Sequence, residues 1–153
     1  MMAIHDIPKS AALLGAAGLI PFVWGALTYL SPELQGWGAR TFGPRFVGPY
    51  ISLFYGAIIL AFMSGVLWGF AAKATGAVAA SGYALSVLPA LWAFFQTGAG
   101  PVSSAIALMA GFIGVLGIDF MFWRQGLAPS WWMALRIPLT VIVVLSLAVV
   151  AFA

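Results

Sequence analysis

GIDFMFWRQGLAPSWWMALRIPLT, from Gly117 to Thr140, is the stretch where specific polar chemistry can sit in an otherwise apolar chain. It holds Asp119, the only acid inside an apolar run, with two of the six basic residues and three of the seven tryptophans. Around it the chain is 64% hydrophobic and 6% charged. Soluble domains carry about 25% charged residues, so lipid must be the solvent for most of this chain.

The hydropathy pattern predicts an all-α, polytopic membrane helix bundle. A span needs about 20 apolar residues, so a chain of this length holds at most about five or six spans and no soluble domain. We therefore predict one membrane domain over residues 1–153. Its five helices are predicted at 11–29, 50–70, 77–95, 102–122 and 137–153. The longest polar break, 31–49, is rich in glycine and proline and is predicted to be a loop with at most one helical turn.

Small residues spaced four apart predict where these helices pack, because they let helix backbones approach closely in lipid. The pairs are Gly65 with Gly69 in the second span, and Ala107 with Gly111 and Ala110 with Gly114 in the fourth. Pro21 and Pro89 lie inside spans and are expected to kink them, since proline removes a backbone donor and crowds the preceding turn.

The basic residues predict the orientation of the bundle. With five spans, Lys9, Lys73, Arg124 and Arg136 fall on the side of the N-terminus, and Arg40 and Arg45 fall on the other. Lysine and arginine are enriched in cytoplasmic loops. The balance therefore predicts an N-terminus inside and a C-terminus outside.

Asp119 is the most conspicuous single residue. It lies about 5 Å inside the hydrocarbon, three residues before the predicted end of its helix. An acid at this depth needs a partner or a wet cavity. We expect a structural ion pair with Arg136, or with Arg124, at the inner boundary. The alternative is a protonatable site or a ligand contact, although one acid alone does not make a proton path.

Several classes of chemistry lack their residues. The chain has no cysteine, and its only histidine, His5, lies before the first span. Disulfides, thiolate metal sites and histidine-ligated haem within the spans are therefore excluded. No phosphate-binding loop, HExxH or GxSxG motif occurs. We expect no catalytic or metal site, no cofactor other than a bound lipid or quinone, and no nucleic-acid partner. Trp123, Trp131 and Trp132 are expected to anchor helix ends in the membrane interface.

An ordered set of sequence pieces resembles the family of small polytopic membrane proteins of bacteria and mitochondria that includes the mitochondrial transmembrane protein 69. The pieces are LGAAGLIPFV (14–23), YGAIILAFMSGVLWG (55–69), LSVLPALWA (85–93), Asp119 and PSWWMALRIPLT (129–140). Leu67 departs from the family, which often has a polar or basic residue there. The resemblance implies the helical fold and a bacterial inner (cytoplasmic) membrane or related energy-transducing membrane. It implies no reaction, because the family has no assigned activity.

Three functions fit these observations. The leading hypothesis is a non-enzymatic accessory or assembly subunit of a larger inner-membrane respiratory or photosynthetic complex, surrounded by membrane lipids. It predicts that Asp119 pairs with an arginine and that another subunit covers one lateral face. A small transporter or channel predicts instead that Asp119 faces a water-filled cavity. A lipid- or quinone-binding protein predicts an apolar slot beside Trp123, Trp131 and Trp132.

Overall fold

The computed structural model describes residues 4–96 and 98–153, and every regular element in those residues is a helix. The first span consists of α1 (Lys9–Ala17) and α2 (Ile20–Leu30), and the others are α4 (Tyr50–Ala71), α5 (Gly76–Gln96), α6 (Pro101–Arg124) and α7 (Trp132–Phe152). Shorter elements are the 3-10 helices η1 (Ile4–Asp6) and η2 (Pro44–Phe46) and the α-helix α3 (Pro32–Phe42). Five spans in this part of the chain are long and apolar enough to cross a membrane. The predicted all-α membrane bundle is therefore confirmed.

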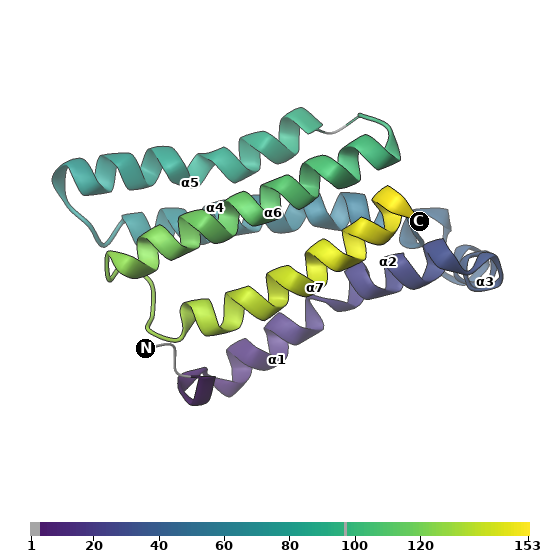
Figure 1. The fold of residues 1–153 in the computed structure, drawn as a ribbon, viewed down its shortest axis with the longest axis horizontal. Coiled ribbons are helices and arrows are strands. Elements are labelled where there is room, and N and C mark those ends of the chain that lie inside the picture. The colour runs from purple at the N-terminus through teal and green to yellow at the C-terminus, as the bar shows by residue number, and fades with distance from the viewer. Residues whose placement is uncertain (1–3, 97) are drawn as a thin grey trace.

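The spans lie lengthwise beside one another, and α1 begins at the end of the bundle opposite to the end of α7 (Figure 1). α4 packs on α2, α5 and α6, while α7 packs on α6 and α2. The main core lies where these helices meet and includes Phe22, Leu60, Phe112 and Leu147. α1 sits at the edge of this arrangement beside α7. We call the end that carries Lys73 and Arg124 the basic end, and the other the α3 end.

The bounds of four spans agree with the predictions within two residues, but the predicted start of the fifth at residue 137 is wrong. α7 begins at Trp132, five residues earlier, directly after the connection formed by residues 125–131. The tandem tryptophans look like an interface signal in the sequence, whereas Trp132 is the first residue of the helix and its indole bonds into the bundle. Pro138 consequently lies inside α7 and not in its first turn.

The prediction that 31–49 is a loop with at most one helical turn is also wrong, because α3 alone has 11 residues. The Ser31 hydroxyl caps it by accepting a hydrogen bond from the Leu34 N–H at 3.3 Å. Gly38 is buried, and a Cβ there would lie 2.8 Å from Val47 and 2.9 Å from Trp24. This glycine allows close packing and does not break the helix.

The two prolines expected to kink their helices have different surroundings. Pro21 is in the first turn of α2, and the span divides just before it, after Gly18. Pro89 lies inside α5, which continues through it as one helix. The N–H of the next residue, Ala90, donates to the Ser64 hydroxyl of α4 at 2.8 Å. A hydrogen bond between helices thus joins α4 to α5 beside the proline.

Candidate functional site

Asp119 is fully buried near the basic end and is bonded on both carboxylate oxygens. Arg136 Nε donates to Oδ2 at 2.8 Å, and Trp132 Nε1 donates to Oδ1 at 2.8 Å. Both donors come from the first two turns of α7, one turn apart and on one face of the helix. The network therefore fixes the start of α7 against the end of α6.

Arg124, the other predicted partner of Asp119, does not reach the carboxylate. It is exposed at the last residue of α6, and its Cζ lies 5.9 Å from the centroid of the Phe120 ring. At the same end, Lys73 Nζ donates to the Leu127 carbonyl at 2.6 Å. That bond connects the turn between α4 and α5 to the connection between α6 and α7.

The three tryptophans predicted as interface anchors lie together at the basic end. Trp123 Nε1 donates to the Ser130 carbonyl at 3.1 Å, and the rings of Trp131 and Trp132 are 5.9 Å apart. Anchoring in the membrane interface stays a prediction for these residues. The sequence pattern did not predict the hydrogen bond from Trp132 to Asp119.

The predicted small-residue contacts form at one of the three pairs. The Ala107 carbonyl accepts a hydrogen bond from Trp92 Nε1 at 2.6 Å, and a Cβ on Gly111 would lie 2.8 Å from the Trp92 ring. Trp92 of α5 therefore packs on α6 at this pair. Ala110 is exposed, and Gly114 has open space where its Cβ would lie.

The helix contact predicted for Gly65 and Gly69 is not formed within the described chain. Both are exposed, and a Cβ on either would have no neighbour within 4 Å. The buried face of α4 is instead formed by residues such as Leu60, Ser64 and Leu67, which follow the helical repeat. The GxxxG face of α4 therefore points away from the bundle.

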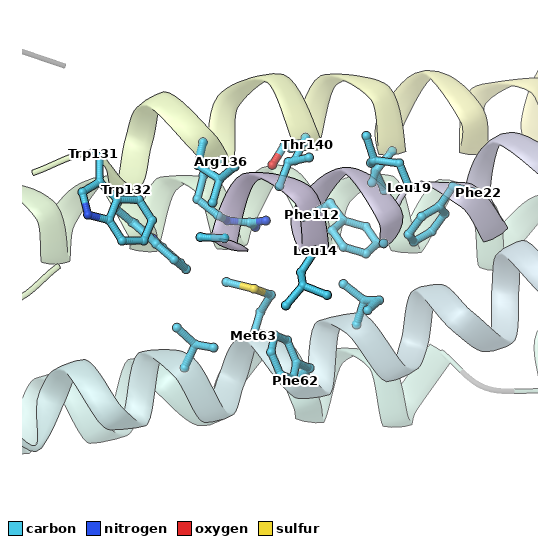
Figure 2. A pocket seen from close by; sticks show the side chains of 18 of the residues that line it. Leu14, Leu19, Phe22, Phe62, Met63, Phe112, Trp131, Trp132, Arg136 and Thr140 are labelled. Carbon is cyan, nitrogen blue, oxygen red and sulfur yellow. The ribbon is translucent and has the colours of Figure 1, made fainter. Parts of the chain in front are cut away.

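A cavity of about 590 Å³ lies beside the ion pair, and α1, α4 and α7 provide most of its wall. This volume is within the usual range of small-molecule sites, about 300–1,000 Å³. Figure 2 shows the Arg136 side chain extending from α7 toward the cavity, with Phe62 and Met63 of α4 on the opposite side. Trp131 and Trp132 line it, and Arg136 is the only charged residue in its wall as described. The lining also includes Leu14, Leu19, Phe22, Phe112, Leu139 and Thr140.

Two buried polar atoms in the residues that line this cavity have no hydrogen-bond partner among the residues that the structure describes. They are Nη2 of Arg136 and Oγ1 of Thr140, in residues that are 7% and 3% exposed. Buried polar atoms are nearly always bonded, so each such exception needs an explanation. Together with Trp132, these residues form a stripe spaced four apart on α7. The spacing is present in the sequence. It indicates a single helix face only if the helix begins at or before residue 132, and the predicted start was residue 137.

The cavity can therefore hold a molecule that is mostly apolar and has one polar group. The apolar walls suit a hydrocarbon body, and the guanidinium offers an N–H donor inside the lipid-facing bundle. Carboxylates that could act in acid–base chemistry do not line it, since Asp119 lies behind Arg136 and is already bonded. Within the residues that the structure describes, no group of three or more metal-ligating side chains forms.

Comparison with known proteins agrees with the predicted family. Over residues 7–152 the chain matches the family described as protein of unknown function (DUF3429). It is 34% identical over 149 residues to Transmembrane protein 69 of Xenopus tropicalis, an alignment that covers 95% of this chain and 54% of that protein. The chain thus spans about half the length of this relative. No solved structure matches it. Because the family match covers almost the whole chain, the protein belongs to the DUF3429 family of polytopic membrane proteins.

Proposed function

We propose that the protein is a non-enzymatic integral membrane protein that binds a membrane-soluble amphiphile in the cavity between α4 and α7. The observation that carries this proposal is an apolar cavity lined by Arg136, a buried residue with one guanidinium nitrogen that has no partner in the described chain. A lipid- or quinone-binding protein was expected to have an apolar slot beside its tryptophans. Trp131 and Trp132 line this cavity, whereas Trp123 does not.

The ion pair has a structural part in this proposal. Asp119 is fully buried and is held by Arg136 and Trp132, so it positions the guanidinium at the cavity wall. A transporter or channel would place Asp119 in a water-filled path. Its complete burial and its two bonds favour the binding role over that alternative.

The amphiphile enters from the side, directly from the lipid. Leu14 on α1 and Phe62 on α4 line the cavity and are 74% and 63% exposed. The basic residues Lys73 and Arg124 lie at the same end as the ion pair, and the positive-inside rule favours the cytoplasmic side for that end. We therefore propose that the polar part of the site lies in the inner leaflet of a bacterial inner membrane or a related energy-transducing membrane.

Two neighbouring leucines provide a matched test. Leu13 and Leu14 are both exposed on α1, at 71% and 74%, but only Leu14 lines the cavity. Leu14→Trp should fill the cavity, and Leu13→Trp should leave it open. The full-length protein would be purified in mild detergent and its bound small molecules extracted and quantified by mass spectrometry.

We expect one amphiphile to be enriched over bulk membrane lipid in the native protein and in Leu13→Trp. The Leu14→Trp protein should lose that enrichment while remaining folded. Equal recovery of the same molecules from all three proteins would contradict the proposed function, because lipid that coats any apolar surface does not depend on the cavity.

A second candidate, an accessory subunit of a larger membrane complex, is favoured by the outward GxxxG face of α4. Gly65 and Gly69 have open space around them, which is suited to the close approach of a helix from another protein. Gly65→Leu with Gly69→Leu should keep the fold and lose proteins that co-purify stoichiometrically. Gly117→Leu is the control, since that glycine is equally open on α6. Co-purification that is the same in both variants would contradict the subunit role of this face.

A further inference from the structure

We infer that the molecule in the cavity is a membrane quinone, whose carbonyl oxygen is the acceptor that the Arg136 guanidinium and the Thr140 hydroxyl lack. The inference rests on the proposed function and names the ligand of the same site. It follows from three properties of the cavity, which are its free donors, its charge balance and the shape of its walls.

The free donors require an acceptor on the ligand. Arg136 uses Nε for Asp119, and its Nη2 lies buried without a partner. A guanidinium nitrogen donates only, so another donor cannot satisfy it. Thr140 lies one turn along α7, also lines the cavity, and has an unpartnered hydroxyl that can donate. A carbonyl oxygen has two lone pairs and can accept from both groups.

The charge balance requires a neutral head. The Asp119 carboxylate already neutralises the charge of Arg136, whose Nε lies 2.8 Å from Oδ2. No other charged residue is among those that line the cavity in the described chain. An anionic head would place a second negative charge beside Asp119 in a medium of low polarity, where an uncompensated charge is costly. A cationic head would meet the guanidinium. A neutral carbonyl adds the missing acceptor and no charge.

The walls are aromatic beside Arg136 and apolar along the rest of the cavity, which suits a ring followed by a hydrocarbon chain. Trp132 and Phe70 meet edge to face with ring centroids 5.2 Å apart, and both line the cavity beside Arg136. Farther along the groove the lining is aliphatic and aromatic, as far as Phe22. A quinone head is neutral and can be buried completely beside Arg136, a residue that is 7% exposed. A phospholipid carries a charged or zwitterionic head that must stay in water.

The test is equilibrium binding of decylubiquinone to the full-length protein in phosphatidylcholine nanodiscs, measured by quenching of tryptophan fluorescence. Thr140→Val keeps the side-chain shape and removes the hydroxyl. It should weaken binding about five-fold, the value of one ordinary hydrogen bond. Thr41→Val is the matched control, because Thr41 is exposed on α3 at the other end of the bundle and should leave the affinity unchanged.

A second variant removes the guanidinium without leaving a buried charge. Asp119→Asn combined with Arg136→Gln replaces the ion pair by two amides and should weaken binding by at least about ten-fold, since a shorter, uncharged amide replaces the guanidinium donor. Tighter binding of an anionic lipid such as phosphatidic acid than of decylubiquinone would overturn the inference. So would binding of decylubiquinone that is the same in the Thr140→Val protein, the double variant and the native protein.

Failure of the inference and failure of the proposed function can be told apart. If decylbenzene, which lacks carbonyls, competes as well as the quinone, the inference is overturned while the cavity still binds an apolar guest. If the purified protein enriches a diacyl lipid that Leu14→Trp removes, the function holds and the quinone is overturned. If neither Leu14→Trp nor any other variant changes what is bound, both fail.

Discussion

Both ends of the bundle bury a polar cluster, and at the basic end the residues that carry unpartnered polar atoms also line a cavity. At the α3 end, Thr28 Oγ1 donates to the Trp24 carbonyl and accepts from the Gly48 N–H, each at 2.8 Å. Gln35 Nε2 donates to the Gly48 carbonyl at 2.7 Å. At the basic end, Asp119 and Arg136 are paired, yet one guanidinium nitrogen has no partner. The cluster at the α3 end bonds segments of the chain to one another. The cluster at the basic end contains a guanidinium donor that has no partner in the described chain.

The comparison also shows when an unpartnered polar atom suggests a ligand. Ser52 Oγ lies toward the α3 end and likewise has no hydrogen-bond partner. It lies tightly against Gly25, so even a methyl group on that glycine would collide with it. No ligand atom could enter there. Arg136 Nη2 belongs to a residue that lines an open cavity, and that difference in space is why the ligand site is assigned to the basic end.

Among variants that compare the two ends, Arg136→Leu is expected to change the free energy of unfolding most. Removing the arginine leaves the Asp119 carboxylate buried without its charge partner, which should lower the free energy of unfolding by about 3–5 kcal/mol. Reversible unfolding in mixed detergent micelles measures this value. The double replacement Asp119→Asn with Arg136→Gln should recover part of the loss. A loss smaller than about 1 kcal/mol for Arg136→Leu would contradict a desolvated pair.

The next effect tests the close packing of the α3 end. A Cβ on Gly48 would collide with the Gly25 carbonyl, and backbone atoms have little freedom to move aside. Gly48→Ala should therefore reduce stability by about 3 kcal/mol, the upper part of the usual range for overpacking. Gly69→Ala is the control and should leave stability unchanged or slightly raised, because its Cβ would enter open space. Equal stability of the two variants would mean that this end is not tightly packed.

The smallest effect compares two threonines, one at each cluster. Thr28→Val leaves the buried Gly48 N–H without its acceptor and should cost about 1 kcal/mol or more in the free energy of unfolding. Thr140→Val removes a hydroxyl that has no partner, so stability without added ligand should hardly change. Both variants are measured by thermal unfolding in detergent. A larger loss for Thr140→Val than for Thr28→Val would show that the Thr140 hydroxyl is bonded within the protein.

The sequence predicted the spans well because each is a long apolar run between polar breaks, and lipid allows few other folds for such runs. It failed where a local signal had two physical meanings. Trp131 and Trp132 fit both an interface anchor and a helix start, and the pattern alone did not show that α7 begins at Trp132, whose indole bonds to Asp119. Gly38 fits both a loop and a close helix contact, and only the neighbouring Val47 and Trp24 distinguish them.

The candidate site was predictable in part. An acid in an apolar helix must find a partner, so the pair of Asp119 with an arginine could be named, but the choice between Arg136 and Arg124 depends on where α7 begins. The shape of the cavity could not be predicted from the sequence, because it depends on how α1 packs against α7. Gly15 lies against Leu139 at that contact, where a Cβ would be 3.1 Å from Leu139 Cδ1. No pattern within a single helix contains that information.

The most direct measurement is a two-dimensional NMR spectrum of the tryptophan indole N–H groups of the full-length protein in nanodiscs, titrated with decylubiquinone. The chain has seven tryptophans, and each contributes one indole signal to this experiment. We predict that the signals of Trp131 and Trp132 shift and saturate together, while those of Trp24 and Trp37 at the α3 end stay in place. Shifts that are equal at both ends, or no shift of Trp132, would contradict a quinone site beside Arg136.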